Sequence, residues 1–462
     1  MPPMLRLAWL CLCSPLLLHA SPQPIRDSIG VIPEAQGFWR SAAQGWLLQI
    51  SDAGIQRWQD TSAGCYATPP ADAKWPLMGQ IEYTLIDFDA DDSAGFQYLP
   101  GDAATRFERV EALPEHCGAE DLSDERSVFE AFVAIMDTHY AFFDARGIDW
   151  SARVRQARPK VRAGMGEAAL RQVLAGMLEG LNDSHTKLIG QVNGERFRIQ
   201  DGQGQTLPRV RAEPGEQSWL QALVRQLLDE VLDEGAEQIG NERIIWGTID
   251  GQVGYLQVFT MGGFSNAPQQ PLSQWAAAEL SELDALLDPI FSRFADTRGV
   301  IVDLSNNRGG YDAIARALAA RFSDSPFDAY TVDTDRDSRA EHHYRIQPAD
   351  GPRYTGPVIV LTSDVTVSGG EIATLALRAL GNVTHAGGRT RGSFSTPLAK
   401  PLPNGWYLEL SSETFADQQG RVWEATGIAP EREFEVFPAD DPVAGHAHVL
   451  RELAAELAGK HE

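Results

Sequence analysis

The run Ser368-Gly-Gly-Glu371 contains the residue types that acyl transfer requires. It follows the apolar run Val358–Leu361, which predicts a buried strand, and from Ile372 onward apolar residues recur at helical spacing. Ser368 therefore lies where a strand, or a short loop after it, meets a helix N-terminus. The unpaired amides of Gly369 and Gly370 would there face a developing negative charge, which suits a nucleophile. The structural alternative is that Ser368 only caps the helix and the glycines only make the turn.

A second glycine turn precedes the serine turn along the chain. The apolar run Gly299–Leu304 predicts another buried strand, the loop Ser305–Gly310 ends in a glycine pair, and a helix is expected over Tyr311–Phe322. This alternation of strands and helices predicts a parallel sheet with both turns at the same end. Gly309 and Ser368 are therefore expected to be neighbours. The alternative is a plain tight turn, and the loop lacks the lysine of a phosphate-binding pattern.

Two further residues, His185 and Glu424, carry no functional signal of their own, although a serine nucleophile is weak at neutral pH until a base removes its proton. His185 follows a helix predicted over Leu170–Leu181, and Glu424 lies three residues before Gly427. Each has an ordinary explanation when taken singly. A histidine just past a helix is more often a satisfied or surface residue, and a lone glutamate is more often a solvated carboxylate.

The chain is expected to form two or more domains, because 462 residues exceed one ordinary domain. Short strand-like pieces separated by Gly, Pro, Asp and Ser predict an N-terminal β domain, and the pattern becomes helical near Asp121. A polar, acidic segment of unspecified fold then leads to the α/β unit. We expect a signal peptide at 1–20, a β domain at 21–120, a helical subdomain carrying His185 at 121–200, a connecting segment at 201–245, the α/β core at 246–440 and a C-terminal helix at 441–462.

Charge and cysteine usage narrow the partners and the compartment. The net charge of -25 argues against nucleic acid or an anionic membrane surface as a partner. The apolar run Leu7–Leu18 is typical of a short secretory signal, and no later stretch is long enough to span a bilayer. Removal of the signal would take Cys11 and Cys13 with it. We expect the remaining pair, Cys65 and Cys117, to be bridged in an oxidising compartment, with two buried free thiols as the alternative.

Five motifs together resemble the serine peptidases that include the tail-specific (carboxy-terminal processing) proteases and the tricorn core protease. Each motif is loose by itself, but their order and spacing are fairly specific over residues 121–435. The resemblance implies a crotonase-like α/β catalytic core with a helical subdomain, and peptides or proteins as substrates. The motifs are Tyr140–Trp150, Leu181–Thr186, Asp303–Gly310, Ser368–Glu371 and Gly427–Pro430.

The family has two catalytic styles, and the sequence favours one of them. The tail-specific branch uses a lysine 25 residues after the nucleophile as the base; here that position is Ser393, and the nearest lysine downstream is Lys400. The tricorn-like branch uses a Ser-His pair from the helical region and a glutamate after the nucleophile, which Ser184-His185 and Glu424 match. The resemblance implies that His185 is the base and that Ser184 and Glu424 orient the groups around the site.

The resemblance also implies an oxyanion hole formed by the amides of Gly369 and of Gly309 or Gly310. Glu371 is expected to stabilise its own helix as a first-turn carboxylate. We therefore predict a secreted or periplasmic serine endopeptidase with a Ser-His-Ser-Glu tetrad and no cofactor, since no metal-ligand spacing is present. Two alternatives stay open: a catalytically silent ligand-binding protein on the same scaffold, and an esterase, although Ser368 lacks a Gly-x-Ser-x-Gly elbow.

Overall fold

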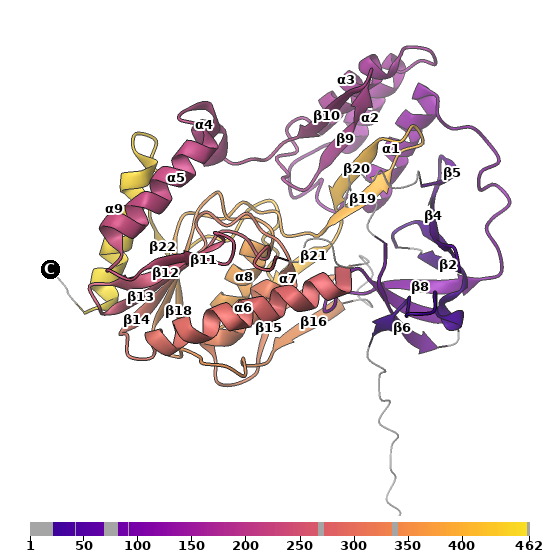
Figure 1. Ribbon diagram of the computed structural model, residues 1–462. Helices are drawn as coiled ribbons and strands as arrows, with labels where there is room; N and C mark the ends of the chain where they lie inside the picture. Colours follow the sequence, from indigo (N-terminus) through magenta and orange to yellow (C-terminus); the bar gives the residue numbers. More distant parts are fainter. Residues whose placement is uncertain are drawn as a thin grey trace, which may run out of the picture.

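The serine and glycine turns follow two neighbouring parallel strands at the centre of the larger lobe (Figure 1). The computed structural model describes residues 22–41, 43–68, 82–90, 92–266, 272–334 and 341–459. The signal peptide expected at 1–20, with Cys11 and Cys13, lies outside these residues. Every helix in the described part of the chain is too short or too polar to span a bilayer.

A seven-stranded sheet forms the core of the larger lobe. The strands from β13 to β22 run parallel, whereas β11 and β12 are antiparallel to their neighbours. The middle strands β13, β14 and β17 are buried along their whole length, which explains their continuous apolar sequences. In spatial order the strands are β11 (Glu237–Ile239), β12 (Ile244–Ile249), β13 (Val253–Val258), β14 (Gly299–Asp303), β17 (Val358–Thr362), β18 (Val383–Gly387) and β22 (Arg432–Glu433).

Helices cover both faces of this sheet, and successive residues of a strand face opposite layers. Val300 and Val302 of β14 pack in one apolar cluster with helices of one face, whereas Ile301 packs in another with helices of the opposite face. The first face carries α6 (Leu272–Phe294), α7 (Asp312–Ala319) and α8 (Gly369–Arg378), and the second carries α5 (Glu216–Gln226) and α9 (Pro442–Leu457). This layered α/β core confirms the predicted fold class. A small antiparallel sheet of β15 (Phe327–Asp333), β16 (Glu341–Ile346) and β21 (Thr414–Asp417) adjoins the first face.

The connecting segment at 201–245 folds into two helices, a π-helical turn and the edge strand β11. α4 (Thr206–Ala212) leads into α5, and η4 (Leu227–Val231) follows α5. Trp219 of α5 packs edge to face against Phe437, with ring centroids 5.2 Å apart. The segment is therefore part of the packed core, beside α9.

Three helices and a four-stranded sheet make the lobe that carries the His185 loop. The strand order is β10-β9-β20-β19, so two strands from the region that the sequence assigned to the α/β core lie here instead. They do so because Leu398, Leu402, Leu408 and Leu410 bury their side chains against the helices. The elements are α1 (Glu125–His139), α2 (Trp150–Ala157), α3 (Glu167–Leu178), β9 (Lys187–Val192), β10 (Glu195–Gln200), β19 (Pro397–Pro401) and β20 (Tyr407–Ser411).

The N-terminal region forms an eight-stranded antiparallel sheet, as its strand-like sequence predicts. A disulfide with an S–S distance of 2.04 Å joins Cys65 to Cys117, which confirms the expected bridge. Tyr66 donates a hydrogen bond to the Pro401 carbonyl oxygen at 2.8 Å and so ties this sheet to β19. Its strands are β1 (Gln23–Pro24), β2 (Gly37–Ser41), β3 (Trp46–Ser51), β4 (Gly54–Thr61), β5 (Gly64–Ala67), β6 (Leu85–Ala90), β7 (Ser93–Gln97) and β8 (Thr105–Val110).

Candidate active site

Ser368 lies between β17 and α8 in a backbone conformation that is costly for serine. β17 ends at Thr362 and α8 begins at Gly369, so Ser368 occupies the N-cap position that the sequence predicts. Its φ of 59° and ψ of -125° fall outside the regions that L-residues favour. Such conformations cost about 1–3 kcal/mol each and persist where surrounding contacts hold them, often at active sites.

Glu371 provides the contacts that hold this turn. Its Oε2 accepts hydrogen bonds from the amides of Ser368 at 3.2 Å and Ser393 at 2.9 Å, and its Oε1 accepts one from Gly392 at 2.6 Å. The side chain is fully buried, and burial raises the pKa of its carboxyl group. The sequence predicted a carboxylate that serves its own helix. In the structure Glu371 also joins the serine turn to the turn at 392–393.

The glycine turn after β14 contacts the serine turn directly, as predicted. A Cβ atom on Gly309 would lie 2.6 Å from Cβ of Ser368, and one on Gly369 would lie 3.0 Å from the amide nitrogen of Gly310. The Gly309 amide itself donates to Oδ1 of Asn307 at 2.8 Å. The amides of Gly310 and Gly369 have no hydrogen-bond partner among the described residues. Of the three predicted oxyanion-hole glycines, these two therefore have an N–H group to offer.

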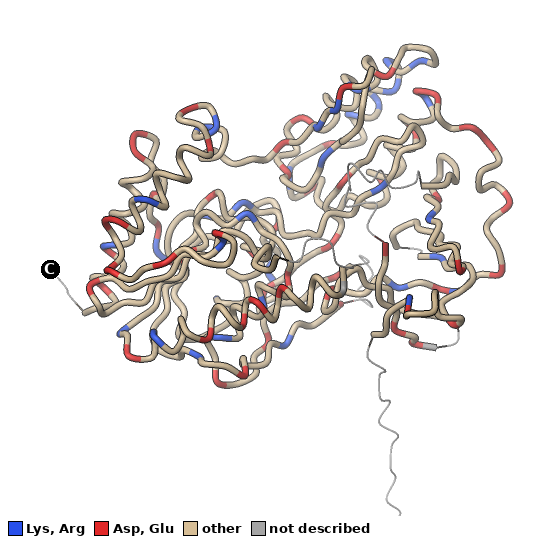
Figure 2. The backbone as a smooth tube through the Cα atoms, viewed as in Figure 1, with Lys and Arg blue, Asp and Glu red and all other residues tan. Residues whose placement is uncertain are grey.

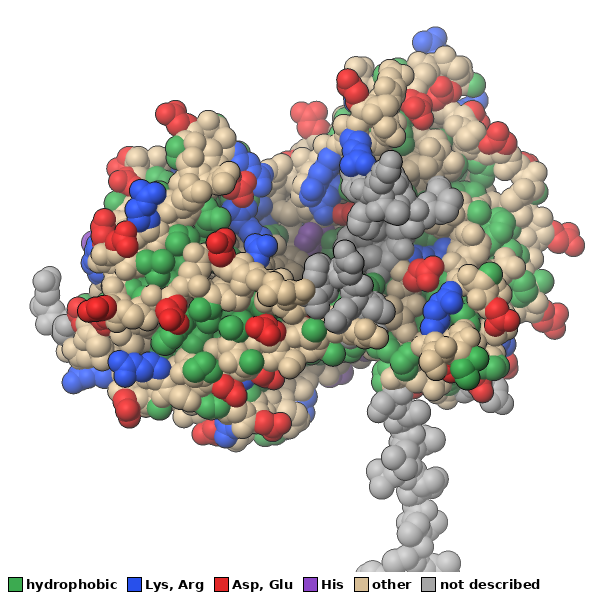
Figure 3. Space-filling model, in the orientation of Figure 1, with side chains coloured by type: hydrophobic (Ala, Val, Ile, Leu, Met, Phe, Trp, Pro, Cys, Tyr) green, Lys and Arg blue, Asp and Glu red, His purple; other side chains and the backbone are tan. Residues whose placement is uncertain are grey.

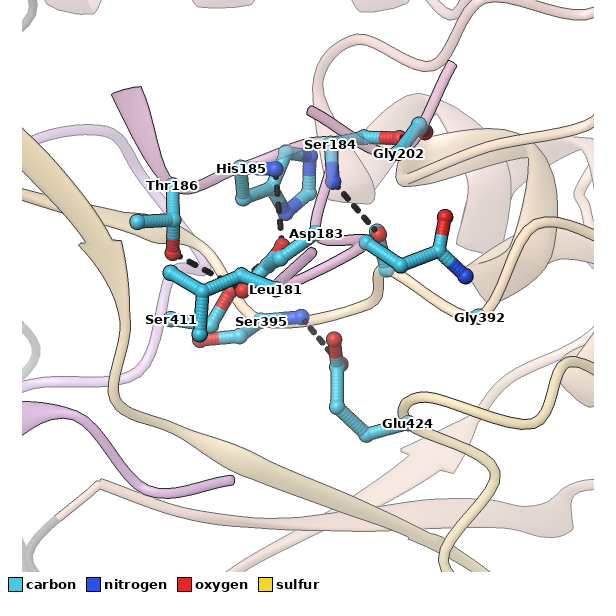
Figure 4. A network of polar contacts seen from close by, with 12 residues as sticks. Leu181, Asp183, Ser184, His185, Thr186, Gly202, Gly392, Ser395, Ser411 and Glu424 are labelled. Carbon is cyan, nitrogen blue, oxygen red and sulfur yellow. Dashed lines mark hydrogen bonds between the residues drawn. The ribbon is translucent and has the colours of Figure 1, made fainter. Parts of the chain in front are cut away.

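Asp183 anchors the loop that carries His185 (Figure 4). Its Oδ1 accepts the His185 amide at 2.9 Å and the Ser411 hydroxyl at 3.2 Å. Its Oδ2 accepts the Thr186 hydroxyl at 2.8 Å and the Tyr140 hydroxyl at 3.0 Å. Four hydrogen bonds to one fully buried carboxylate fix the backbone on which the imidazole is mounted.

The His185 ring is buried, and its two nitrogens differ in their surroundings. Its Nδ1 has no hydrogen-bond partner among the described residues. Burial lowers the pKa of His185 to about 4, and the charge of Lys187 adds to this lowering. The imidazole is therefore neutral at neutral pH, which is the protonation state that a general base needs.

The histidine loop and the serine turn meet at Ser393. The Ser184 amide donates to Oγ of Ser393 at 3.2 Å, and the Ser368 amide donates to the Ser393 carbonyl oxygen at 3.1 Å. No hydrogen bond in the described part of the chain joins the His185 ring to Ser368 itself. Ser393, at the position of the lysine in the tail-specific branch, is thus a bridge between the two loops.

Ser184 uses its hydroxyl away from the histidine ring. Its Oγ donates to the carbonyl oxygen of Gly202 and accepts a hydrogen bond from Arg391 at 3.3 Å. Within the described residues the structure does not join Ser184 to Glu424 by a hydrogen bond. The two predicted orienting residues therefore act on different parts of the site.

Glu424 holds the backbone at 394–395. Its Oε2 accepts the amides of Phe394 at 2.8 Å and Ser395 at 3.1 Å, and its Oε1 accepts Nη2 of Arg146 at 3.0 Å. Only 3% of the residue is exposed, so it is not the solvated surface carboxylate of the alternative interpretation. Burial raises the pKa of Glu424 to about 8, and the nearby charge of Asp183 contributes, against the opposing effect of Arg146.

The side chain of Lys400 contacts the N-terminal β domain. Its Nζ donates to the Gln44 carbonyl oxygen and lies 3.7 Å from the centroid of the Trp46 ring. The residue is fully buried, and burial lowers the pKa of its amine well below the usual value. No hydrogen bond or ion pair among the described residues links Lys400 to Ser368, and the choice of base stays a prediction.

Sequence reasoning missed three positioning residues of this site: Asp183, Arg146 and Ser393. The first two lie inside the motifs Leu181–Thr186 and Tyr140–Trp150, where they drew no separate assignment. Ser393 was noticed only because it is not lysine. A signal was available for Asp183 and Arg146, since charged residues within apolar motifs are buried only when they are paired.

Comparisons with known proteins show the family of this chain. Residues 252–434 match the family model of peptidase family S41, and residues 123–179 match the tricorn protease C1 domain. The first segment contains the serine and glycine turns with Glu424, and the second contains α1, α2 and α3. The chain therefore belongs to the serine peptidases that include the tail-specific and tricorn proteases, and it is a serine-type peptidase.

Solved structures show the same fold. A candidate peptidase from Parabacteroides merdae shares 22% identity, with a TM-score of 0.57 over 72% of this chain and 97% of that chain. Mature CPAF shares 15% identity, with a TM-score of 0.52 over 72% of this chain and 97% of that chain. Mature CPAF complexed with lactacystin shares 14% identity, with a TM-score of 0.50 over 73% of this chain and 99% of that chain.

Proposed function

We propose that this chain is a secreted or periplasmic serine endopeptidase in which Ser368 is the nucleophile and His185 is the general base. The observation that carries the proposal is the serine turn. Ser368 has a φ of 59° at a strand-to-helix junction, and the amides of Gly310 and Gly369 beside it have no partner among the described residues. Two available N–H donors beside a serine can bind the oxyanion of acyl transfer, and costly backbone conformations such as that of Ser368 cluster at active sites.

The proposed reaction begins when His185 takes the proton of the Ser368 hydroxyl, and Oγ attacks the carbonyl carbon of the scissile peptide bond. The amides of Gly310 and Gly369 bind the oxyanion of the tetrahedral intermediate. The imidazolium then protonates the leaving amine, and the acyl-enzyme is hydrolysed by water that His185 deprotonates in turn. Because catalytic hydrogen bonds often tighten only when substrate is bound, we expect the His185 ring to approach Ser368 in the complex.

Ser184 and Glu424 complete the proposed tetrad as positioning residues. The Ser184 amide donates to Ser393, which also accepts the Ser368 amide, and the Ser184 hydroxyl ties the histidine loop to Gly202 and Arg391. Ser184→Ala removes only the hydroxyl contacts. Glu424 fixes the next two residues of the same strand-like segment through the amides of Phe394 and Ser395. We expect Ser184→Ala and Glu424→Gln to lower kcat/KM less than His185→Ala does, because they orient groups without exchanging a proton with substrate.

The compartment is inferred from the N-terminus and the cysteines. The Cys65–Cys117 disulfide is stable in an oxidising environment and rare in the cytosol of mesophiles. Together with the signal sequence expected at 1–20, this supports secretion or a periplasmic location. Finding the processed chain, with intact residues from about 21 onward, in the culture medium or periplasm of the source cell would test this part.

Peptide hydrolysis by purified Ser368→Ala protein is the test of the proposed nucleophile. We expect the variant to lose hydrolysis while it keeps the wild-type melting temperature, because a covalent mechanism has no substitute for the nucleophile. Turnover of a matched ester and peptide separates an esterase from a peptidase. A wild-type protein that binds peptides but hydrolyses neither substrate would instead support the silent binding protein.

A further inference from the structure

Three arginines gather beside the catalytic turns of a chain whose net charge is -25. Arg308 directly precedes the glycine turn, Arg391 directly precedes Gly392, and Arg211 comes from α4. Figure 2 shows basic positions on α4 and on the loops beneath it. In the space-filling view, basic side chains line both walls of the hollow between the two lobes (Figure 3). Such a local reversal of charge favours an anionic ligand.

Glu216 shows that this cluster can hold a carboxylate. Its Oε1 lies 3.0 Å from Nη2 of Arg308, and its Oε2 lies 2.6 Å from Nε of Arg211, so each carboxylate oxygen contacts a different guanidinium. The side chains of Arg308 and Glu216 are 26% and 36% exposed, respectively. Solvent therefore reaches this ion pair, and a second carboxylate can compete for it.

Arg391 has an unused donor next to the histidine loop. Its Nε donates to the Asp364 carbonyl oxygen at 2.6 Å, and its Nη1 donates to Gly202 at 3.0 Å and to Ser184 at 3.3 Å. Its Nη2 is buried without a hydrogen-bond partner among the described residues. Burial lowers the pKa of the Arg391 and Arg308 guanidinium groups, and the charge of Arg211 lowers both further, against the opposing charges of Asp364 and Glu371 beside Arg391 and of Glu216 beside Arg308. An additional negative charge would offset this repulsion.

We propose that Arg211, Arg308 and Arg391 form a subsite that binds a carboxylate of the peptide substrate. The inference rests on the proposed function and extends it to specificity. Arg308 is adjacent to Gly309, which contacts Ser368, and Arg391 bonds to Ser184, which adjoins the base. A substrate whose scissile carbonyl lies at Ser368 therefore has its neighbouring residues within reach of the cluster. The carboxylate belongs either to an acidic side chain or to the free C-terminus of the peptide.

A set of matched peptides distinguishes the two sources. One cleavable sequence is prepared with Glu or Gln at each position flanking the scissile bond, and every peptide is made as the C-terminal acid and as the amide. Each peptide pair compares a carboxylate with its neutral counterpart, either Glu with Gln or the C-terminal acid with the amide. In one of these two comparisons we expect the wild-type kcat/KM to be about tenfold or more higher for the carboxylate peptide, as for a hydrogen bond to a charged group. The effective change, Glu to Gln or acid to amide, identifies the source.

Substitutions in the arginine cluster test whether it causes the preference for carboxylate peptides. We expect Arg308→Gln and Arg391→Gln to reduce the ratio of kcat/KM between carboxylate and neutral peptides to about one to threefold. Glu216→Gln should raise the ratio, because it removes the competing carboxylate. Arg353→Gln is the control: this arginine forms a comparable ion pair with Asp324 at 2.9 Å and should leave the ratio at the wild-type value.

Binding by the Ser368→Ala variant keeps the inference testable if no peptide is cleaved. Fluorescence anisotropy with the same peptides should give a lower Kd for the carboxylate form, and the difference should shrink at high salt. Equal affinity for carboxylate and neutral peptides, or a preference that survives in folded Arg308→Gln and Arg391→Gln proteins, would overturn the subsite. Carboxylate-selective binding without hydrolysis by the wild-type protein would overturn the proposed function and leave the subsite standing.

Discussion

Replacing Glu371 by glutamine tests whether this residue only stabilises the N-terminus of α8 or also holds the serine turn in place. The carboxylate accepts three amides, from Ser368, Gly392 and Ser393. Glutamine keeps the shape of the side chain but has one acceptor oxygen, and its NH2 group must then face at least one of these N–H donors. The substitution therefore leaves a buried amide unsatisfied at the turn that holds the nucleophile.

The expected loss follows from these contacts. A hydrogen bond to a charged acceptor contributes about 1.5–3 kcal/mol, and a buried amide left without a partner costs about 1–3 kcal/mol. We therefore expect Glu371→Gln to lower the free energy of unfolding by about 2 kcal/mol. Because Ser368 is held with a φ of 59°, loosening the turn should also lower kcat/KM by about tenfold or more. If Glu371 only stabilised the N-terminus of α8, the loss would be about 0.3–1 kcal/mol with unchanged kcat/KM.

Urea denaturation and peptide hydrolysis on the same preparations measure both effects. Glu167→Gln is the matched control, because Glu167 is an exposed carboxylate in the first turn of α3. The reasoning is refuted if Glu371→Gln and Glu167→Gln lose the same stability and both keep the wild-type kcat/KM.

Three further predictions concern the base, the pH dependence and the disulfide. His185→Ala should lower kcat/KM by orders of magnitude. The kcat/KM of Lys400→Met, assayed at a temperature where the variant is folded, should stay within about threefold of the wild-type value. An inactive Lys400→Met together with an active His185→Ala would reverse the assignment of the base. Because the pKa of His185 is lowered to about 4, the acid limb of kcat/KM should rise through about pH 4 and not through the usual imidazole range near 6.5. The folded state binds this proton less readily than the unfolded state, so the stability contributed by neutral His185 should be lost as the pH falls from about 6.5 to about 4; a pH titration of urea unfolding, compared with His185→Gln, checks the sign. Denatured, unreduced protein should show no thiol from Cys65 or Cys117 on titration, and reduction should cost about 3–5 kcal/mol in the chain-entropy model, measured by urea unfolding.

The positions of the catalytic turns follow from sequence because they depend on local patterns. A β-branched run before Ser368 and an apolar helical period after it are enough to place the serine at a strand-to-helix junction. Parallel strands then bring Gly309 to the same edge, which the contact between Gly309 and Ser368 confirms. The two cysteines likewise could be paired by compartment and number alone.

The hydrogen bonds and packing contacts of the site join residues far apart in the sequence, and local sequence patterns do not predict such contacts. Glu371 looks like any first-turn glutamate until the turn at 392–393 folds back onto it. β19 and β20 look like core strands until their leucines meet the helices of the other lobe. The pKa of His185 could not be predicted from the sequence either, because the lowering to about 4 comes from burial of the ring in the folded chain.

Labelling with a serine-directed fluorophosphonate, followed by mass spectrometry of the modified peptide, tests the central claim most directly. The account predicts one adduct, on Oγ of Ser368, that is absent in Ser368→Ala and forms much more slowly in His185→Ala. An adduct on a different serine, or no adduct on folded wild-type protein that hydrolyses peptides, would contradict it.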